Sequence, residues 1–388
     1  MSTRIKILRI IPTLNPASGG PAQHIKLITP FLNKLNIETT VISLDEPSDS
    51  FLENLSFKII PMGRPSSPWQ YNKKLYQKLQ EIIAEYDLVI QHGLWLYHGY
   101  AIKKALKNKS NPSKTPLLIY PHGMLDPYYQ VEKKRWLKAL RNKLYFWLIE
   151  KNILTNASAL IFTSEIELKT HESSFGKING PQKVNLGYTS RAIEKIEVQR
   201  NNNLLFFGRI DPKKGIDELL IAWSKFKSNS PNKSTLLIAG PGWQSKYGLK
   251  LSRRINKDEI LSKTLTILEQ QEQNQIQYLL NSSKASILWS KHENFAQAIS
   301  ESLSVGTPVL VSKGVNIFKE IESNSAGFVE NPDWEGAYHA IKKLYELNDS
   351  EYKKISSNAI ELFQKNFHPS LYAKRLREYF EITLGVKQ

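Results

Sequence analysis

Short apolar runs alternate with helical patterns along the whole chain. The first series of strand-like runs covers residues 5–11, 38–43, 57–61, 88–91, 117–120 and 160–163. A second series covers residues 204–207, 235–239, 265–268, 285–289, 308–311 and 327–329. Apolar runs of this length with helices between them are typical of βαβ units in a parallel sheet. The pattern therefore predicts an α/β protein with a parallel sheet in each half.

The stretch between the two series, residues 179–203, has no strong periodicity and is rich in asparagine, glycine and charged residues. We interpret it as the crossover between two Rossmann-like domains. The chain of 388 residues is also long for a single hydrophobic core. We therefore predict one domain over residues 1–185 and a second over residues 186–370. Helical patterns continue from residue 334 to the end.

The composition is that of a folded protein in a reducing compartment. Hydrophobic residues make up 41% of the chain and charged residues 23%, as in soluble globular proteins. The absence of cysteine excludes disulfides, thiolate metal sites and cysteine nucleophiles. Arg9 interrupts the apolar N-terminus, which favours a first strand over a signal peptide. No run approaches the roughly 18 apolar residues of a membrane span, so we expect a cytoplasmic protein.

The net charge of +17 indicates an anionic partner. Nucleic acid, an anionic membrane surface and anionic small substrates all fit, and composition does not separate them. Residues 132–151 interleave lysine and arginine with tryptophan, leucine and phenylalanine. A basic helix of this kind can lie on an anionic lipid surface, which would make the protein peripheral on the inner face of a membrane. The alternative is a solvated basic face whose apolar side packs on the sheet.

Candidate functional residues surround a helix predicted within residues 288–311. Ile299 and Leu303 share one face of this helix, which we expect to begin close after Asn294. Glu293 then precedes the helix and Glu301 lies inside it, eight positions later. Eight steps of about 100° bring the two carboxylates only roughly to one side. They therefore suit two ends of one ligand better than a close acid/base pair; ordinary solvated carboxylates are the alternative.

The start of the same helix offers backbone donors. The N–H groups of Asn294, Phe295 and Ala296 lie where a helix leaves its first donors unsatisfied. A helix start of this kind can bind a polar ligand. We therefore predict that these three residues contribute to the same ligand site as the two glutamates.

A basic loop follows the first strand of the second half. The strand ends at Gly208, and Arg209 and Lys214 project from the loop behind it. Arginine offers a planar fork of donors and lysine a compact charge, which together suit a diphosphate. A solvated basic loop is the alternative interpretation.

The first half has its own candidates at the predicted carboxyl edge of the sheet. Gly19 and Gly20 lie between a strand and a helix, where the backbone can approach a ligand closely. A tight turn that binds no ligand is the alternative. The strand at 117–120 delivers His122 to this edge. A purely structural histidine is the alternative.

Three further residues are candidates at the same edge of the sheet. His92 and Trp95 follow the strand at 88–91 and are expected to line a substrate site, unless they only pack. Asp126 follows His122 in the chain and is a candidate base. No HExxH helix, Walker A sequence or Gly-x-Ser-x-Gly turn is present.

Two blocks of sequence resemble a known family. Glu293-x7-Glu301 followed by Gly-Thr-Pro-Val at 306–309 is similar to the nucleotide-sugar signature of the retaining glycosyltransferases of family 4. The Gly-Arg…Lys-Gly sequence at 208–215 is similar to their phosphate-binding motif. Ala296 departs from the family, which usually has glycine at this position.

The resemblance implies the GT-B fold, in which two Rossmann-like domains face each other across a cleft. The C-terminal helix, expected here within residues 371–388, crosses back onto the first domain. In such an enzyme Arg209 and Lys214 neutralise the leaving phosphate and His122 lies against the donor sugar. We count Glu293, which is expected to hold sugar hydroxyls, with these catalytic residues. The donor-binding residues would be Gly19, Gly20, Gly208, Asn294, Phe295, Ala296 and, at the ribose, Glu301. His92, Trp95 and Asp126 would lie on the acceptor side.

The reaction that the resemblance implies is retaining transfer of a hexose from a UDP- or GDP-sugar. The acceptor would be a glycan or a lipid-linked molecule in surface polysaccharide or glycolipid synthesis. Same-face attack, with the leaving phosphate accepting the proton, needs no dedicated base, so Asp126 as base is the alternative. The chain has no Asp-x-Asp sequence for a metal clamp, and we expect no metal or other cofactor.

Other functions remain compatible with parts of the sequence. Another GT-B enzyme, such as a sugar phosphorylase or a nucleotide-sugar epimerase, would share the fold. A transferase-like protein that only binds polysaccharide or lipid would not need the charged residues of both motifs. A nucleic-acid-binding protein would explain the charge, but no recognised binding motif supports it, and we expect no nucleic acid partner.

Overall fold

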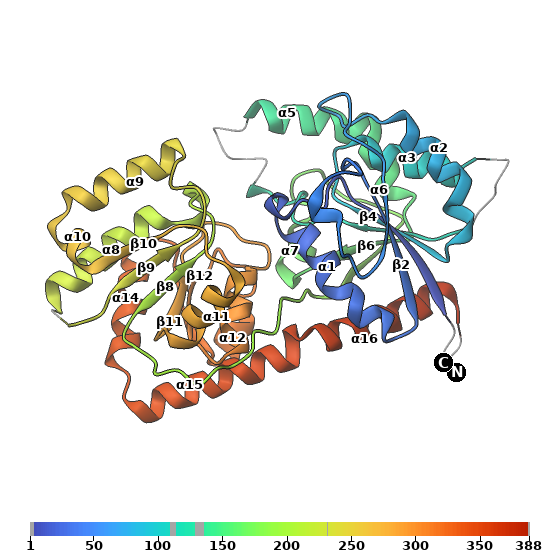
Figure 1. Ribbon diagram of the computed structural model, residues 1–388. Helices are drawn as coiled ribbons and strands as arrows, with labels where there is room; N and C mark the ends of the chain where they lie inside the picture. Colours follow the sequence, from blue (N-terminus) through green and yellow to red (C-terminus); the bar gives the residue numbers. More distant parts are fainter. Residues whose placement is uncertain (1–3, 109–113, 129–135, 231, 387–388) are drawn as a thin grey trace. The chain divides into compact units, whose positions relative to one another are not determined.

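The computed structural model describes residues 4–108, 114–128, 136–230 and 232–386 (Figure 1). The chain forms two compact units, one comprising residues 1–188 and 369–388 and the other residues 189–368. Each unit is a parallel sheet covered by helices, which confirms the predicted α/β class. The chain passes from one unit to the other after residues 188 and 368. The boundaries predicted from the sequence are residues 185 and 370.

The first unit contains a seven-stranded sheet in the order β3-β2-β1-β4-β5-β6-β7. All neighbours are parallel. The order reverses between β1 and β4, and open α/β sheets bind ligands at the carboxyl ends of such a pair. The strands are β1 (Ile5–Ile10), β2 (Ile37–Ser43), β3 (Lys58–Pro61), β4 (Leu88–His92), β5 (Leu117–Tyr120), β6 (Ala159–Phe162) and β7 (Gln182–Asn185).

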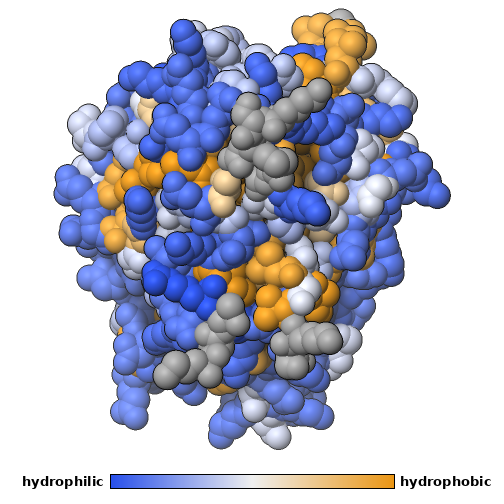
Figure 2. Space-filling model, turned by 90° about the vertical axis from the view of Figure 1, so that its right-hand side faces the viewer, coloured by the Kyte–Doolittle hydropathy of each residue, from blue (hydrophilic) through white to orange (hydrophobic). Residues whose placement is uncertain are grey.

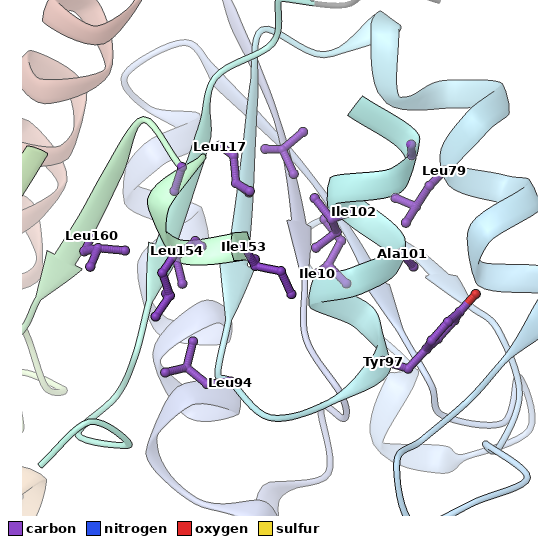
Figure 3. Packing of buried hydrophobic residues seen from close by; sticks show 14 of the residues in the cluster. Ile10, Leu79, Leu94, Tyr97, Ala101, Ile102, Leu117, Ile153, Leu154 and Leu160 are labelled. Carbon is purple, nitrogen blue, oxygen red and sulfur yellow. The ribbon is translucent and has the colours of Figure 1, made fainter. Parts of the chain in front are cut away.

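Helices cover both faces of this sheet. On one face α2 (Lys73–Ile82), α3 (Tyr97–Leu106) and α6 (Lys151–Thr155) pack on residues of β1, β4, β5 and β6. Figure 3 shows side chains of these helices, including Leu79, Ile102 and Ile153, gathered beside Ile10 and Leu117. On the other face α1 (Gly20–Asn33) packs beside α16 (Pro369–Leu384). The remaining helices of the unit are α5 (Trp136–Tyr145) and α7 (Glu165–Thr170).

The second unit contains a six-stranded parallel sheet in the order β10-β9-β8-β11-β12-β13. Its order reverses between β8 and β11, so the loops after these strands share one edge. The strands are β8 (Leu204–Phe207), β9 (Leu236–Ala239), β10 (Leu265–Leu268), β11 (Ala285–Leu288), β12 (Val309–Ser312) and β13 (Gly327–Glu330). The helices are α8 (Ile216–Asn229), α9 (Lys246–Lys257), α10 (Glu259–Thr264), α11 (Gln273–Ser282), α12 (Gln297–Ser304), α13 (Phe318–Ser323), α14 (Trp334–Glu346) and α15 (Asp349–Leu362).

The segment 179–203, predicted as a crossover, contains a strand that the sequence pattern does not reveal. β7 pairs with β6 at the sheet edge, and its residues are exposed or half-buried. An edge strand of this kind needs no apolar alternation, so its sequence gives little signal.

Further along the same segment Arg200 ties the second unit together. Its guanidinium donates to Thr307 Oγ1 (2.7 Å) and to the carbonyls of Ser283 (3.1 Å) and Val305 (3.0 Å). Thr307 in turn donates to the carbonyl of Leu280 (2.5 Å). The Gly-Thr-Pro-Val sequence at 306–309 therefore contributes to the packing of this unit through its threonine.

The C-terminal helix belongs to the first unit, in agreement with the prediction that the chain crosses back onto the first domain. α16 begins at Pro369, two residues before the predicted start, and Tyr372, Leu376 and Phe380 are buried in the first core. In the part of the chain that the structure describes, no helix has both the length and the hydropathy to cross a membrane.

One carboxyl group lies inside the first core. Glu150, at the end of the π-helical segment Phe146–Glu150, is fully buried. Its Oε2 accepts the backbone N–H of Trp95 (3.0 Å), and its Oε1 has no hydrogen-bond partner among the described residues. Burial raises the pKa of Glu150 to about 8 from its ordinary 4.5. The carboxyl is therefore protonated in the folded protein at neutral pH.

Replacing Glu150 by glutamine should remove a pH dependence of stability. Because the folded-state pKa is raised, the stabilising effect of the protonated group is complete below pH 4.5 and is lost as the pH rises toward 8. We expect the free energy of unfolding of the wild type to fall by on the order of 3 kcal/mol more than that of Glu150→Gln between pH 5 and 8. Denaturant unfolding at both pH values measures this, with exposed Glu85→Gln as control. Parallel pH profiles for wild type and Glu150→Gln would contradict it.

Candidate functional site

Two opposite charges meet at the carboxyl ends of β8 and β11. Lys214 lies in the turn after β8, and Glu293 lies in the loop after β11. Lys214 Nζ is 2.5 Å from Glu293 Oε2, and the side chains are only 15% and 18% exposed. Lys213 Nζ lies 3.8 Å from the same oxygen. Arg209, on the same loop as the two lysines, is exposed and has no hydrogen bond or ion pair among the described residues.

The charge state of Glu293 follows from these neighbours. Burial raises the pKa of Glu293, but the positive charges of Lys214 and Lys213 outweigh this effect, so its pKa lies below the ordinary value. The backbone of Glu293 is fixed as well, because its N–H donates to the carbonyl of Gly314 (2.8 Å) and its carbonyl accepts the N–H of Asn316 (2.9 Å). The ionised carboxylate therefore holds the Lys214 ammonium at a defined place on this edge of the sheet.

Gly215 is the last residue of the basic motif, and there is no room for a side chain at its position. It has a φ of 65° and is the residue from which α8 continues. A Cβ atom at this position would lie 1.9 Å from the carbonyl oxygen of Trp289, at the end of β11. Only glycine lets the turn after β8 pass this close to β11. The glycine of the motif thus brings Lys214 to Glu293.

The helix after Glu293 begins later than predicted. α12 starts at Gln297, and Ala296 is its cap residue in the left-handed conformation, with φ 59° and ψ 66°. Alanine rarely adopts this conformation, which explains why glycine is usual here in the family that the motif resembles. The N–H groups of Ala296, Gln297 and Ala298 have no acceptor among the described residues. The donors of the helix start therefore lie farther along the chain than the predicted set of 294–296.

The other two residues of that predicted set lie in the loop before the helix. Phe295 is buried, and its ring packs against Phe367 at a centroid distance of 5.5 Å. Asn294 Oδ1 accepts a hydrogen bond from Asn316 Nδ2 at 3.4 Å. The side chains of both residues thus help to fix the loop.

Glu301 has a cationic partner that sequence reasoning missed. Arg191 Nε donates to Glu301 Oε1 at 2.9 Å. Burial raises the pKa of Glu301, and the charge of Arg191 opposes this effect without cancelling it. The second carboxylate oxygen makes no hydrogen bond among the described residues and is not enclosed. Arg191 belongs to the irregular stretch after β7, where the sequence gives no periodic signal.

In the first unit the residues after β1, β4 and β5 line a small cavity of about 180 Å³. Ser18 and Pro21, which flank the predicted Gly19-Gly20 pair, contribute one wall. Gly19 has a φ of 105°, and α1 starts at Gly20. The other lining residues are Ile11, Pro12, Thr13, Ala22, His92, Gly93, Leu96, His122 and Met124.

Two histidines of this cavity are hydrogen-bonded to each other. His92 Nδ1 lies 3.0 Å from His122 Nε2, and their rings are nearly parallel, at 16°. Burial lowers the pKa of both rings, and the positive charge of Arg9 lowers it further. The pKa of His122 is about 3, so the ring is neutral at physiological pH.

A buried carboxylate holds the backbone beside His122. Glu167 Oε1 accepts the N–H of Gly123 (2.6 Å), and its Oε2 accepts both the N–H (2.8 Å) and the hydroxyl (2.7 Å) of Thr163. His122 itself has a φ of 53°, an uncommon conformation that these contacts support. The sequence carries a weak signal for Glu167, because Ser164-x-x-Glu167 caps the start of α7.

The two remaining acceptor-side candidates are engaged elsewhere. The ring of Trp95 packs against Phe175 and Tyr145 at centroid distances of 5.2 and 6.3 Å, and Trp95 does not line the cavity. Asp126 is buried, and its Oδ1 accepts the backbone N–H of Tyr128 (2.9 Å).

Two groups of predicted residues therefore come together, one in each unit. Gly19, Gly20, His92 and His122 gather at the switch point of the first sheet. Lys214 and Glu293 gather at that of the second, where Gly208 directly follows β8 and its N–H donates to the carbonyl of Ala239 (2.9 Å). No group of three or more His, Asp or Glu residues that could hold a metal ion occurs within the described ranges.

Replacing Ala296 by glycine tests the left-handed cap. An L-residue in this conformation costs about 1–2 kcal/mol, and glycine gives back part of this through its flexible unfolded state. We expect Ala296→Gly to raise the free energy of unfolding by about 0.5 kcal/mol. The control Ala298→Gly, two residues later in right-handed helix, should lower it by about 0.5–1 kcal/mol. Denaturant unfolding that shows the same sign for both variants would contradict the conformation of Ala296.

Family models cover most of the chain. The model described as Glycosyltransferase Family 4 matches residues 18–184, and the model described as Glycosyl transferases group 1 matches residues 190–362. A sequence search of curated proteins finds no match. The two matched ranges fall within the first and second compact units.

Solved structures share the fold at low sequence identity. Sucrose-phosphate synthase from Thermosynechococcus elongatus is 18% identical, with a TM-score of 0.77, over 99% of this chain and 100% of that one. HepE from Anabaena, solved with UDP and glucose, is 19% identical with a TM-score of 0.72, over 98% and 100%. A glycosyltransferase from Rickettsia africae is 18% identical with a TM-score of 0.75, over 100% of both chains. Together with the two family models, these likenesses show that the chain is a GT-B glycosyltransferase and belongs to glycosyltransferase family 4.

Proposed function

We propose that this glycosyltransferase moves a hexose from a nucleotide-diphosphate sugar to a glycan or lipid-linked acceptor, with retention of configuration. The observation that carries the proposal is the largely enclosed pair of Lys214 and Glu293, on the same edge as Arg209, which has no ion pair among the described residues. A site that concentrates cations at the carboxyl ends of β8 and β11 suits a diphosphate. The structures of HepE with UDP and with UDP-glucose support a UDP-sugar as the donor.

The chemistry that we propose is electrostatic. As the bond to the sugar breaks, negative charge develops on the departing phosphate, and fixed cations stabilise it. Lys214, which is held by Glu293, and Arg209, which is exposed and has no ion pair among the described residues, supply this charge. The unpaired N–H groups at the start of α12 and the carboxylates of Glu293 and Glu301 would hold sugar and ribose hydroxyls. We propose that this reaction uses no metal.

Contact between His122 and the donor sugar is proposed from the family resemblance. In support, His122 lines a cavity in the first unit and is held neutral there. A neutral ring contributes a hydrogen bond to a sugar hydroxyl without placing a second positive charge beside an oxocarbenium-like carbon. Because the leaving phosphate accepts the proton of the acceptor, Asp126 needs no role as base, and its contact with Tyr128 agrees with a structural role.

Arg209→Ala and Lys214→Ala should each lower kcat by about 10²–10³, as expected for the loss of one charge-stabilising donor. The donor is chosen first, as the nucleotide among UDP, GDP and ADP that raises the melting temperature most. Release of that nucleotide from its hexose conjugates then measures turnover. Arg253→Ala, which removes an exposed arginine of α9 in the same unit, is the matched control.

Near-normal turnover in both variants would contradict the roles of Arg209 and Lys214. Turnover that disappears with EDTA and returns with a divalent cation would contradict the metal-free mechanism. Product analysis with and without acceptor separates transfer from a sugar phosphorylase, which needs phosphate, and from an epimerase, which needs no acceptor.

We also propose that the enzyme works in the cytoplasm, on the inner, anionic face of a membrane. The α5 surface consists of apolar side chains with exposures from 59% to 69%: Leu137, Leu140, Leu144, Trp147 and Leu148. Lys138, Arg141 and Lys143 lie exposed on the same helix, and Lys151 lies over the ring of Trp147 at 4.2 Å. Residues 132–135 of the predicted basic segment lie outside the described residues.

The α5 surface is exposed because other residues of the same segment already fill the side of the helix that faces the protein. Ala139 and Phe146 are buried against the first unit, so the side of the helix that faces the protein is already filled. Figure 2 shows one face of the molecule, on which hydrophobic side chains gather at the upper edge and again near the middle, between mostly hydrophilic residues. Exposed leucines and a tryptophan beside lysine and arginine match the chemistry of an anionic lipid surface.

Replacing Leu140, Leu144 and Trp147 together by serine should weaken binding to anionic vesicles at least about tenfold, because each apolar side chain contributes roughly 1–3 kcal/mol when it leaves water. Co-sedimentation with vesicles containing phosphatidylglycerol measures the effect, and neutral vesicles should bind weakly. Ile382→Ser, which removes an exposed side chain from α16, is the matched control. Equal binding by the triple variant and the wild type would contradict the assignment of the α5 surface.

A further inference from the structure

A buried arginine lies beneath the cavity of the first unit. Arg9, the last residue but one of β1, is fully buried, and within the described part of the chain it has no carboxylate partner. Its only hydrogen bond there runs from Nη1 to His92 Nε2 at 3.2 Å. A buried cation is costly unless it is paired or has another use. The contact with His92 therefore needs a functional explanation.

The hydrogen-bond direction at His92 follows from the chemistry of arginine. A guanidinium only donates, so His92 Nε2 must accept and carries a lone pair. His92 is neutral, because burial and the charge of Arg9 keep its pKa well below 6.5. The single proton of its ring therefore sits on Nδ1, which faces His122 Nε2 at 3.0 Å.

The tautomer of His122 follows from the same hydrogen bond. Its Nε2 accepts a hydrogen bond from the Nδ1–H of His92, so the proton of the neutral His122 ring sits on Nδ1. That nitrogen has no hydrogen bond among the described residues and is not fully enclosed. His122 lines the cavity with Ser18 and Pro21. It therefore presents an N–H donor, and its only lone pair is already occupied.

Packing prevents the two rings from turning over. The ring of Tyr120 stacks on His92 and on His122, with centroid distances of 5.3 and 5.6 Å and angles of 13° and 22°. Glu167 holds the backbone of Gly123 next to His122. The orientation of both imidazoles is thus determined by Tyr120 and Glu167, neither of which lines the cavity.

We propose that Arg9 and His92 are positioning residues that fix His122 as the Nδ1–H tautomer, so that it acts as a hydrogen-bond donor and not as a general base. Free imidazole in water prefers the other tautomer, with the proton on Nε2. The identity of the accepting oxygen, a hydroxyl of the donor sugar, rests on the proposed function. The tautomer itself does not.

Long-range ¹H–¹⁵N correlation spectra of protein labelled at histidine report the tautomer directly. We expect Nδ1–H signatures for both His92 and His122 in the wild type at pH 7, assigned through His92→Gln and His122→Asn. Arg9→Met should abolish the signature at His122, and Arg9→Lys, which keeps one donor, should retain it. In an assay with nucleotide sugar, Arg9→Met should lower kcat about tenfold or more, as for a weakened hydrogen bond.

A second pair of variants covers the case in which Arg9→Met does not fold. His92→Gln keeps an acceptor toward Arg9 and a donor toward His122, so the Nδ1–H signature of His122 should persist. His92→Leu has neither group and should lose it.

An Nε2–H signature at His122 in the wild type would overturn the proposal, as would an unchanged signature in Arg9→Met or His92→Leu. The expected signatures in a protein that turns over no nucleotide sugar would support the positioning role and contradict the proposed function instead.

Discussion

The reversal of strand order in each sheet is the constraint on which the rest of the structure depends. Between β1 and β4, and again between β8 and β11, neighbouring strands send their following helices to opposite faces of the sheet. The loops that leave these strands therefore diverge and leave space at the carboxyl edge. His92 and the Gly19 loop end at the first reversal, and Lys214 and Glu293 end at the second. Every residue to which we assign chemistry lies at or beside one of these edges.

Charged side chains near these edges have different partners in the two units. In the second unit two largely enclosed carboxylates have cationic partners: Glu293 has Lys214, and Glu301 has Arg191. Pairing offsets part of the energetic cost of taking each charge out of water, and it leaves neither charge uncompensated. In the first unit Arg9 has no carboxylate partner among the described residues, and it donates a hydrogen bond to the neutral His92. The first arrangement fixes charges, and the second fixes the position of a proton.

Two departures from simple rules mark sites of function or contact. Ala296 adopts a left-handed conformation that favours glycine, directly at the start of the helix that carries Glu301. The α5 surface gathers five large, exposed apolar side chains, whereas other described helices expose such side chains singly, as α16 does with Ile382. Both features cost stability in isolation, and both lie where we place a ligand: the sugar at α12 and the membrane at α5.

The sequence by itself determined the strands, the two units and the candidate residues at strand ends, because apolar periodicity and glycine or charged residues after a strand are local signals. It missed β7, an edge strand without an apolar pattern, and it placed the start of α12 too early, since a left-handed alanine has no local signature. Arg191, Glu167 and the role of Arg9 were decided only by the tertiary structure. Their partners lie 110, 44 and 83 positions away in the chain, and a pairing across such a distance depends on packing that no local pattern records.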